Sequence, residues 1–212
     1  MEKIKALSFD PNHITIERAS IENREVAARL SLMAYKDFAY DLFGTKNDEK
    51  VLEYFRSLWS IEKNRFSYRY SYIAKVNSLP VGLLTCYPGN WVHKLIAPTI
   101  RSVFEIRKLS YLWYLITHIY YFAYFLQAVE AYPDEFYIGT LAVLPEYRNY
   151  GIGAKLIEFA VLQARQNELQ KCTLLVAEEN SAGMRFYERN AFKKVIHVAK
   201  PFPYYKVTKK FK

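Results

Sequence analysis

The chain has 212 residues, of which 51% are hydrophobic and 24% charged, a composition ordinary for a globular protein that forms one domain with an insertion. Its two cysteines, Cys86 and Cys172, belong to no Cys-x-x-Cys motif and no His/Cys cluster, so we expect buried thiols in a reducing compartment and no metal site. The formal net charge is +9, and residues 193–212 contain seven lysines and no acidic residue.

The first elements in chain order are predicted to be two helices. Residues 1–5 are charged and lack the apolar run of a signal peptide, so a cytoplasmic protein is expected. Apolar residues at helical spacing predict a helix over 22–43, and Gly44 is expected to end it. Asn47 is expected to cap the second helix, whose early acidic residues suit the positive end of the helix dipole.

Strand-like patterns follow these helices. Residues 67–76 are rich in tyrosine, residues 81–87 are continuously apolar, and Asn77-Ser78-Leu79-Pro80 lies between them. This order predicts a strand, a turn and a second strand.

Residues 109–129 form a segment of 21 residues without a charge. Its length alone would suggest a membrane span, but a span would place the flanking strands of one sheet on opposite sides of a bilayer. We therefore predict an aromatic-rich helical insertion at about 88–133, with its helix beginning near Pro98. It either forms an acceptor pocket over the sheet or a homodimer interface, and attachment to a membrane surface is the less favoured alternative.

The last part of the chain predicts an alternation of strands and helices. We expect a strand over 136–143, a helix over 151–166, a strand over 172–177 and a helix over 181–189, followed by two strands. No linker divides the chain, so residues 1–212 are predicted to form one domain. The lysines after residue 192 are expected on an exposed face of the final strands, where a solvated surface is the simplest interpretation and nucleic-acid binding is not expected.

Chemistry is indicated where the strand ending at Val143 runs into a loop and two glycines, Gly151 and Gly153, open a helix. A helix start leaves backbone N–H groups without partners and carries a partial positive charge. Glycines remove Cβ atoms, so a phosphate can approach these N–H groups closely. The pattern predicts a pyrophosphate site, with turn glycines as the structural alternative. It matches neither a P-loop nor the dinucleotide fingerprint.

A second block, residues 180–192, follows one helix and one strand later. Together the two blocks resemble the GNAT superfamily of CoA-dependent N-acyltransferases, whose two sequence motifs they match. The matching positions are Arg148, Gly151 and Gly153 in the first motif, and Asn180, Phe186, Tyr187 and Phe192 in the second. Two positions depart from the family pattern, because Gly183 replaces a common alanine and Ala191 replaces a turn glycine. We expect Asn190 to take the positive φ that this turn needs.

The resemblance implies an α+β (mixed α/β) fold. Its central, mostly antiparallel sheet would be splayed at strands 4 and 5 and flanked by helices, with the insertion between strands 3 and 4. It also implies an N-acetyltransferase that moves an acetyl group from acetyl-CoA, its co-substrate, to an amine by direct attack on the thioester. The alternative is a non-catalytic acyl-CoA-binding sensor of the same fold.

Site residues are likewise implied by the resemblance. Backbone groups of the strand would bind pantetheine, the helix start would bind the pyrophosphate, and Asn180 would bind the pantetheine arm. The CoA-binding residues would be Leu141, Ala142, Val143, Arg148, Asn149, Tyr150, Gly151, Ile152, Gly153, Ala154, Asn180 and Tyr187. Tyr187 is also the predicted general acid, because a phenol of pKa about 10 can donate a proton to the leaving thiolate.

The general base is predicted less directly. Strand alternation would place Glu135 and Tyr137 on the same face as Leu141, and some family members have a carboxylate where Glu135 stands. The alternative is that Glu135, next to Pro133 and Asp134, belongs to an exposed loop. Residues 98–132 are expected to shape the acceptor side, where their aromatic side chains could form an apolar pocket with hydroxyl groups.

Overall fold

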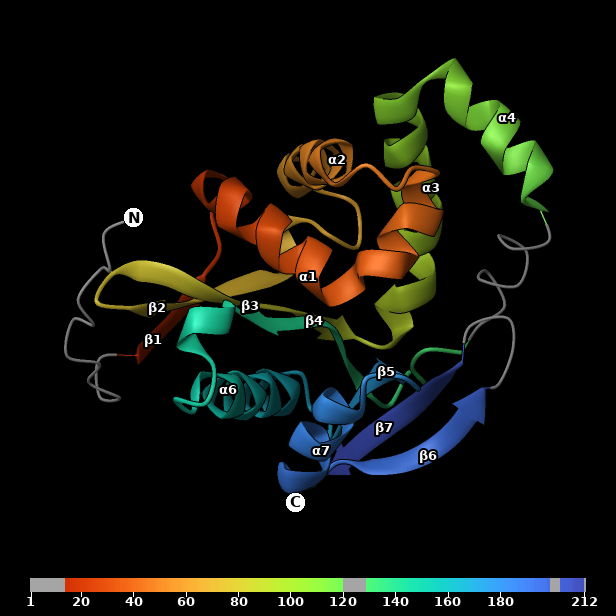
Figure 1. Ribbon diagram of the computed structural model, residues 1–212. Helices are drawn as coiled ribbons and strands as arrows, with labels where there is room; N and C mark the ends of the chain where they lie inside the picture. Colours follow the sequence, from red (N-terminus) through yellow and green to blue (C-terminus); the bar gives the residue numbers. More distant parts are fainter. Residues whose placement is uncertain (1–13, 120–128, 199–202, 212) are drawn as a thin grey trace.

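A computed structural model describes residues 14–119, 129–198 and 203–211. Its centre is a 7-stranded sheet of order β1-β2-β3-β4-β5-β7-β6, antiparallel throughout except for the parallel pair β4–β5 (Figure 1). The strands are β1 Ile14–Arg18, β2 Ser71–Val76, β3 Leu79–Pro88, β4 Phe136–Val143, β5 Lys171–Ala177, β6 Lys193–Val198 and β7 Tyr204–Lys210. The predicted mixed α/β fold with a mostly antiparallel sheet is confirmed.

Helices cover both faces of this sheet. Helices α1 to α4 lie on one face, and α6 and α7 lie on the other (Figure 1). Their bounds are α1 Arg24–Phe43, α2 Asp48–Ser60, α3 Asn90–Arg107, α4 Leu109–Thr117, α6 Ile152–Gln166 and α7 Ser181–Arg189. Short 3-10 helices span Ile21–Asn23, Tyr68–Tyr70 and Pro145–Tyr147.

The predicted ends of the first two helices are confirmed. Gly44 follows α1 in the left-handed conformation, with φ of 62°, which glycine adopts without a steric penalty. The side chain of Asn47 accepts a hydrogen bond from the Lys50 backbone N–H (3.0 Å) and so caps α2. The prediction that helices come first is wrong, because β1 precedes them. Its alternating pattern is only five residues long and rests on Ile14 and Ile16.

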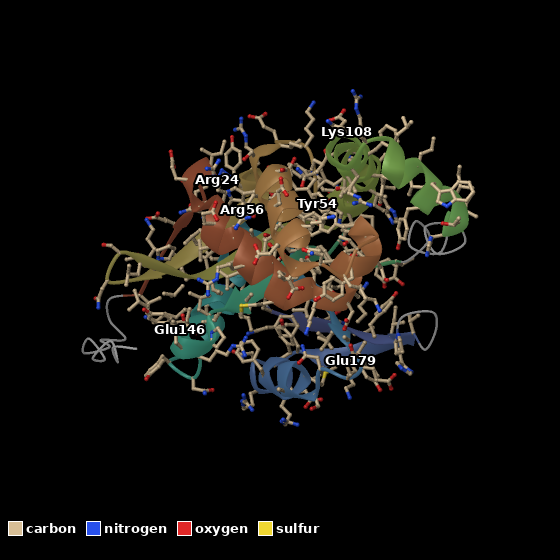
Figure 2. All side chains as sticks on the ribbon, turned by 45° about the horizontal axis from the view of Figure 1, so that its top comes forward. Arg24, Tyr54, Arg56, Lys108, Glu146 and Glu179 are labelled. Atoms are coloured by element: carbon tan, nitrogen blue, oxygen red, sulfur yellow. The ribbon has the colours of Figure 1, made fainter. Side chains whose placement is uncertain are left out.

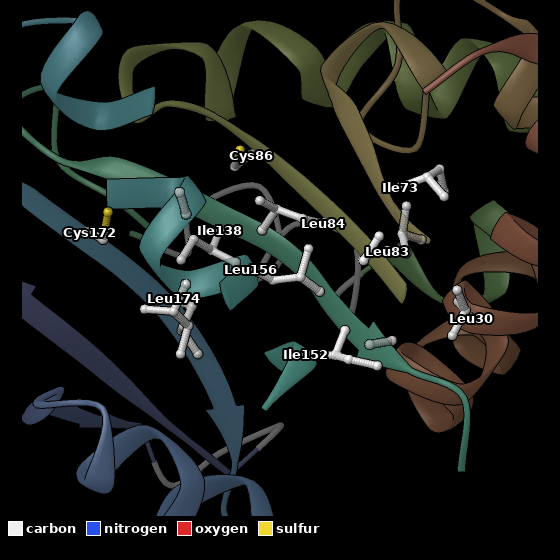
Figure 3. Close-up of a cluster of buried hydrophobic side chains, with 14 of the residues drawn as sticks. Leu30, Ile73, Leu83, Leu84, Cys86, Ile138, Ile152, Leu156, Cys172 and Leu174 are labelled. Atoms are coloured by element: carbon white, nitrogen blue, oxygen red, sulfur yellow. The ribbon is translucent and has the colours of Figure 1, made fainter. Parts of the chain in front are cut away.

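The main core extends over both faces of the sheet, against α6 on one side and against α1 and α2 on the other. Leu84, Ile138 and Leu156 are among its buried side chains (Figure 3). Cys86 and Cys172 are free thiols in this core, as predicted. Burial raises the pKa of both thiols, that of Cys172 to about 12, so both stay protonated and unreactive at neutral pH.

The first helix of the insertion begins earlier than predicted. Helix α3 starts at Asn90, directly after β3, and Pro98 lies inside it rather than at its start. Gly89 joins the two elements where the chain leaves and re-enters the sheet. Its N–H donates to the Glu135 carbonyl (2.7 Å), and a Cβ there would lie 2.1 Å from the Tyr132 carbonyl oxygen. Only glycine therefore fits at the base of the insertion.

Over the ranges 14–119, 129–198 and 203–211, no helix combines the length and the apolar character needed to cross a membrane.

Candidate active site

An opening forms where β4 and β5 separate. The two parallel strands pair only through Phe136 with Cys172 and Tyr137 with Thr173, whereas β5 pairs with β7 over its whole length. Among the described residues, no strand pairs with the β5 side of β4 beyond Tyr137, so the backbone polar groups of 138–143 that bond neither β3 nor a side chain are available to a ligand. The expected splay at strands 4 and 5 is confirmed, and Leu141, Ala142 and Val143 lie beyond the point of separation.

A β-bulge in β4 lies beside this opening. The β3–β4 register passes from Cys86–Ile138 to Thr85–Thr140 and leaves Gly139 as an extra residue. The Gly139 carbonyl accepts a hydrogen bond from the Tyr35 hydroxyl of α1 (2.5 Å), which in turn accepts one from the Thr140 hydroxyl (2.9 Å). Helix α1 thus holds the bulge in place.

The bulge overturns the predicted alternation of β4. Tyr137 pairs with Tyr87 and Leu141 pairs with Leu84. Residues 84 and 87 lie on opposite faces of β3, because successive side chains alternate and paired residues share a face. Tyr137 and Leu141 therefore face opposite sides of the sheet. The prediction that they share a face is wrong, because one extra residue reverses the alternation.

The start of α6 forms the second part of the site. Gly151 has φ of 80°, and the first bond of the helix runs from the Lys155 N–H to the Gly151 carbonyl (3.1 Å). The N–H groups of Ile152, Gly153 and Ala154 consequently lack intrahelical partners. A Cβ on Gly151 would meet no atom within 4 Å, so the helix start is open on that side.

The loop before α6 is closed by Arg148. Its Nε donates to the Val143 carbonyl at the end of β4 (3.1 Å), and its side chain is otherwise exposed. Asn149 has φ of 67°, a left-handed conformation that asparagine tolerates better than most residues. Tyr150, the next residue, is 49% exposed. The residues predicted to bind a pyrophosphate thus surround an exposed helix start.

Gly153 has a packing role that the sequence did not predict. A Cβ at this position would lie 2.9 Å from the Cζ atom of Phe186 in α7. The glycine therefore lets α7 pack against the first turn of α6. This contact places the second sequence motif beside the first.

Asn180 caps α7. Its side-chain oxygen accepts a hydrogen bond from the Gly183 N–H (2.8 Å), and its amide nitrogen lies 2.6 Å from where a Cβ of Gly183 would be. The folded-back cap occupies the space that an alanine side chain would need. An alanine at position 183 would therefore require the Asn180 side chain to shift.

Tyr187 is positioned by the end of α7. The Phe192 N–H donates to the Tyr187 carbonyl (3.0 Å) and the Ala191 N–H to the Glu188 carbonyl (3.0 Å), a Schellman motif in which the rings of Tyr187 and Phe192 also meet at 5.7 Å. Ala191 has φ of 66°, whereas Asn190 has φ of −94°. The prediction that Asn190 takes the positive φ is wrong, because this motif requires it one residue later.

The phenol of Tyr187 is partly buried. Burial raises its pKa, and no charged group contributes to the shift. The hydroxyl therefore stays protonated at neutral pH and is available as a proton donor.

Glu135 lies in a buried ion pair. It is 5% exposed, and its Oε2 lies 2.7 Å from Nζ of Lys206 and accepts a hydrogen bond from the Tyr132 N–H (2.8 Å). Lys206 is fully buried, with its Nζ 3.9 Å from the centre of the Tyr132 ring. The exposed-loop alternative for Glu135 is wrong. An exposed face for Lys206 is also wrong, because β7 is an interior strand and Glu135 supplies the opposite charge.

A polar cluster that the sequence did not predict lies between the sheet and the helices on the α1 side. The Arg65 guanidinium contacts Glu130 Oε2 (2.5 Å), the Tyr137 hydroxyl donates to the same oxygen (2.5 Å), and Arg65 Nε donates to the Tyr87 hydroxyl (3.3 Å). Glu130 is 3% exposed, and among the described residues its other oxygen, Oε1, has no hydrogen-bond partner. Burial raises the pKa of Tyr87 and Tyr137. We call Arg65, Tyr87, Glu130 and Tyr137 the polar cluster.

One signal for this cluster was present in the sequence, because Glu130 is the first charged residue after the uncharged run 109–129. A small apolar pocket adjoins it, and Arg65 belongs to both. The pocket is lined by Phe38, Leu42, Arg65, Phe66, Ile96, Thr99 and Ile100. The aromatic residues predicted at the acceptor side fall partly outside the described residues, namely Tyr120, Tyr121, Phe122, Tyr124 and Phe125.

Known proteins resemble this chain in sequence. It is 38% identical to N-alpha-acetyltransferase 30 of Saccharomyces cerevisiae over 69 residues, which are 32% of this chain and 38% of the yeast protein. It is 26% identical to an uncharacterized N-acetyltransferase of Archaeoglobus fulgidus over 172 residues, which are 81% of this chain and 88% of that protein.

Solved structures share the fold. An N-acetyltransferase from Staphylococcus aureus Mu50 matches 92% of this chain and 99% of its own, with a TM-score of 0.69 and 22% identity. The PaiA N-acetyltransferase of Thermoplasma acidophilum, solved with coenzyme A, matches 93% of this chain and 99% of its own, with a TM-score of 0.53 and 17% identity. The model of the acetyltransferase (GNAT) family matches residues 35–192, a range that contains both motifs, the splayed strands and the start of α6. The chain therefore belongs to the acetyltransferase (GNAT) family.

Proposed function

We propose that this protein transfers an acetyl group from acetyl-CoA to an amine by direct attack of the amine on the thioester. The observation that carries the proposal is the separation of β4 from β5, together with the N–H groups of Ile152, Gly153 and Ala154, which lack intrahelical partners. Related proteins support it, since the Thermoplasma acidophilum structure contains coenzyme A and a family acetyltransferase of Elizabethkingia anophelis was solved with acetyl-CoA.

The proposed CoA site follows the exposed backbone. The pyrophosphate lies at the start of α6, where the helix dipole favours negative charge. Pantetheine lies along Leu141 to Val143, on the side of β4 from which β5 has separated. Asn180 contributes its amide nitrogen, because its side-chain oxygen is already used to cap α7.

The proposed reaction forms an amide bond and breaks the C–S bond. The amine attacks the thioester carbonyl carbon, and a backbone N–H of β4 stabilises the negative charge on the oxygen. Coenzyme A then leaves as a thiolate, and Tyr187 donates a proton to the sulfur. Its raised pKa keeps the phenol protonated until that charge develops. The proton that the amine loses goes to a base or to water.

Glu135 is the general base proposed from the sequence. Its ion pair with Lys206 supports a different assignment, in which Glu135 has a structural role. Glu135→Gln alone does not separate the two, because it leaves the Lys206 ammonium buried without a charged partner. The double variant Glu135→Gln/Lys206→Met removes both charges. If Glu135 is the base, the double variant stays about 10²-fold slower than the native protein. If Glu135 is structural, the double variant recovers both stability and turnover.

The activity itself is tested by CoA release with acetyl-CoA and a panel of amines, polyamines, amino acids and peptides. We expect turnover with at least one class of amine. Tight binding of acetyl-CoA without release in any combination would instead identify a non-catalytic sensor. The proposal also includes that residues 1–212 form one domain and that the protein acts in the cytoplasm.

A further inference from the structure

Helix α4 is firmly attached to the body of the protein by one face. The Tyr111 hydroxyl donates to the Leu42 carbonyl (2.6 Å), and the Tyr114 hydroxyl donates to the Asp41 carbonyl (2.8 Å). Both acceptors lie in the last turn of α1, and Tyr111 is fully buried in the cluster that contains Phe43 and Phe55. These contacts fix which face of α4 points outward.

The outward face of α4 is apolar. Leu109, Leu112, Trp113 and Ile116 recur at the spacing that forms one stripe on a helix, and Ile119 lies two residues after the end of the helix. Trp113 is 73% exposed and Leu109 is 79% exposed. Single exposed hydrophobic residues are normal on a protein surface, but a contiguous row of them is unusual. Helix α4 lies at the edge of the molecule, away from the sheet (Figure 1). We call these five residues the α4 stripe.

An exposed lysine adjoins the α4 stripe. Residues 107–129 contain no acidic residue, and the whole chain carries a net charge of +9. Arg107 points to α2, where it donates to the Tyr54 hydroxyl (2.9 Å), so Lys108 supplies the exposed positive charge next to the stripe. Lys108 is exposed and directly precedes Leu109, at the start of α4 (Figure 2). An exposed apolar stripe with a tryptophan and an adjacent lysine, on a chain of net positive charge, has the chemistry that binds an anionic lipid surface.

The size of the α4 stripe favours a lipid surface over a second copy of the chain. A stable protein–protein interface buries about 800 Å² and about 20–30 residues on each side. Helix α4 has 9 residues, and its outward face offers only part of them. A lipid surface needs no complementary shape, because an apolar helix face enters the headgroup region to a depth of about 5–10 Å.

We propose that the α4 stripe docks this protein on anionic membrane surfaces. Docking of this kind is peripheral and reversible, since it uses one short helix face and an adjacent lysine. The inference does not depend on the proposed acetyl transfer.

Sedimentation of the full chain with lipid vesicles tests this inference. We expect binding to vesicles of phosphatidylcholine mixed with phosphatidylserine, weaker binding to phosphatidylcholine alone, and a decrease as salt is raised. Leu112→Glu should lower the vesicle affinity about tenfold or more, because it places a charge where an apolar side chain enters the lipid. Leu162→Glu is the matched control: Leu162 is 49% exposed on α6, across the sheet, and Leu112 is 47% exposed. The control should bind as the native protein does.

Two results would overturn the inference. One is a native protein that stays in the supernatant with phosphatidylserine vesicles, and the other is a Leu112→Glu protein that binds them as well as the native chain. Sedimentation without lipid identifies the alternative. If Leu112→Glu halves the mass and Leu162→Glu does not, the α4 stripe is an interface between two copies.

Discussion

The CoA side and the polar cluster are built in different ways. On the CoA side, the proposed ligand groups are mostly backbone N–H groups within 141–154, next to the second motif at 180–192. The polar cluster instead brings together side chains from distant segments, such as Arg65 and Glu130, which are 65 residues apart. A backbone site needs only a few glycines at short spacing and is visible in a sequence. A side-chain site depends on tertiary packing.

The largest expected effect is on the polar cluster. Arg65→Met leaves the Glu130 carboxylate buried without its partner, which should lower the free energy of unfolding by about 3–5 kcal/mol. Denaturant unfolding measures this change. The double variant Arg65→Met/Glu130→Leu should recover most of the loss, because both charges are removed.

The same double variant tests whether the polar cluster faces the acceptor. If it does, acceptor KM rises in the restored protein while acetyl-CoA KM stays unchanged. Unchanged acceptor kinetics would show that the polar cluster has only a structural role. The CoA side would then be a ligand site, and the polar cluster would be part of the protein core.

Tyr187→Phe tests the one side chain proposed to act chemically on the CoA side. The ring and its contact with Phe192 remain, so CoA affinity measured by calorimetry should not change. The kcat should fall by about 10²-fold or more when the proton donor is lost. Because burial raises the pKa of Tyr187, ionisation of the phenol should not lower native kcat at mildly alkaline pH. A native kcat retained by Tyr187→Phe would show that the thiolate leaves without this donor.

Substitutions of Gly151 and Gly153 distinguish a ligand site from a packing site. Gly153→Val should lower stability by about 1–3 kcal/mol, because its side chain would overlap Phe186, and it should weaken CoA binding as α7 moves away. At Gly151 the Cβ of a valine would have no atom within 4 Å, although φ of 80° strains this variant by about 1–2 kcal/mol. It should weaken CoA binding at least as much as Gly153→Val does. A folded Gly151→Val protein with native CoA affinity would contradict a pyrophosphate at the start of α6.

Sequence patterns predicted the elements that are long or capped. The helix over 22–43 ends at Gly44, the strand over 136–143 has the predicted bounds, and Asn47 caps as expected. The short strand β1 was missed, because its five residues carry little pattern. The bulge at Gly139 could not be predicted, because it depends on pairing with β3 and on a hydroxyl from α1.

The ion pair of Glu135 with Lys206 likewise could not be predicted from local sequence patterns. The sequence predicts Glu135 as a general base or as part of an exposed loop beside Pro133 and Asp134, and the alternation around Lys206 predicts an exposed lysine. Their burial follows from the position of β7 between β5 and β6 and from contact across 71 positions of the chain, which no local pattern records.

The smallest expected effect is a change in stability at the turn that positions Tyr187. Here the sign of the change, rather than its size, tests the structure. Ala191 has φ of 66°, a conformation that costs an L-residue about 1–2 kcal/mol and costs glycine almost nothing. Ala191→Gly should therefore raise the free energy of unfolding by about 0.5–1 kcal/mol, after the greater entropy of glycine in the unfolded chain is subtracted. Asn190→Gly is the matched control, because Asn190 has φ of −94° and its amide donates to the Phe186 carbonyl (2.8 Å), so this variant should lose stability. Thermal unfolding of both proteins measures the two signs, and turnover should stay native in Ala191→Gly because the Schellman bonds use only backbone groups. The opposite pair of signs would place the left-handed residue at Asn190, as the sequence alone predicted.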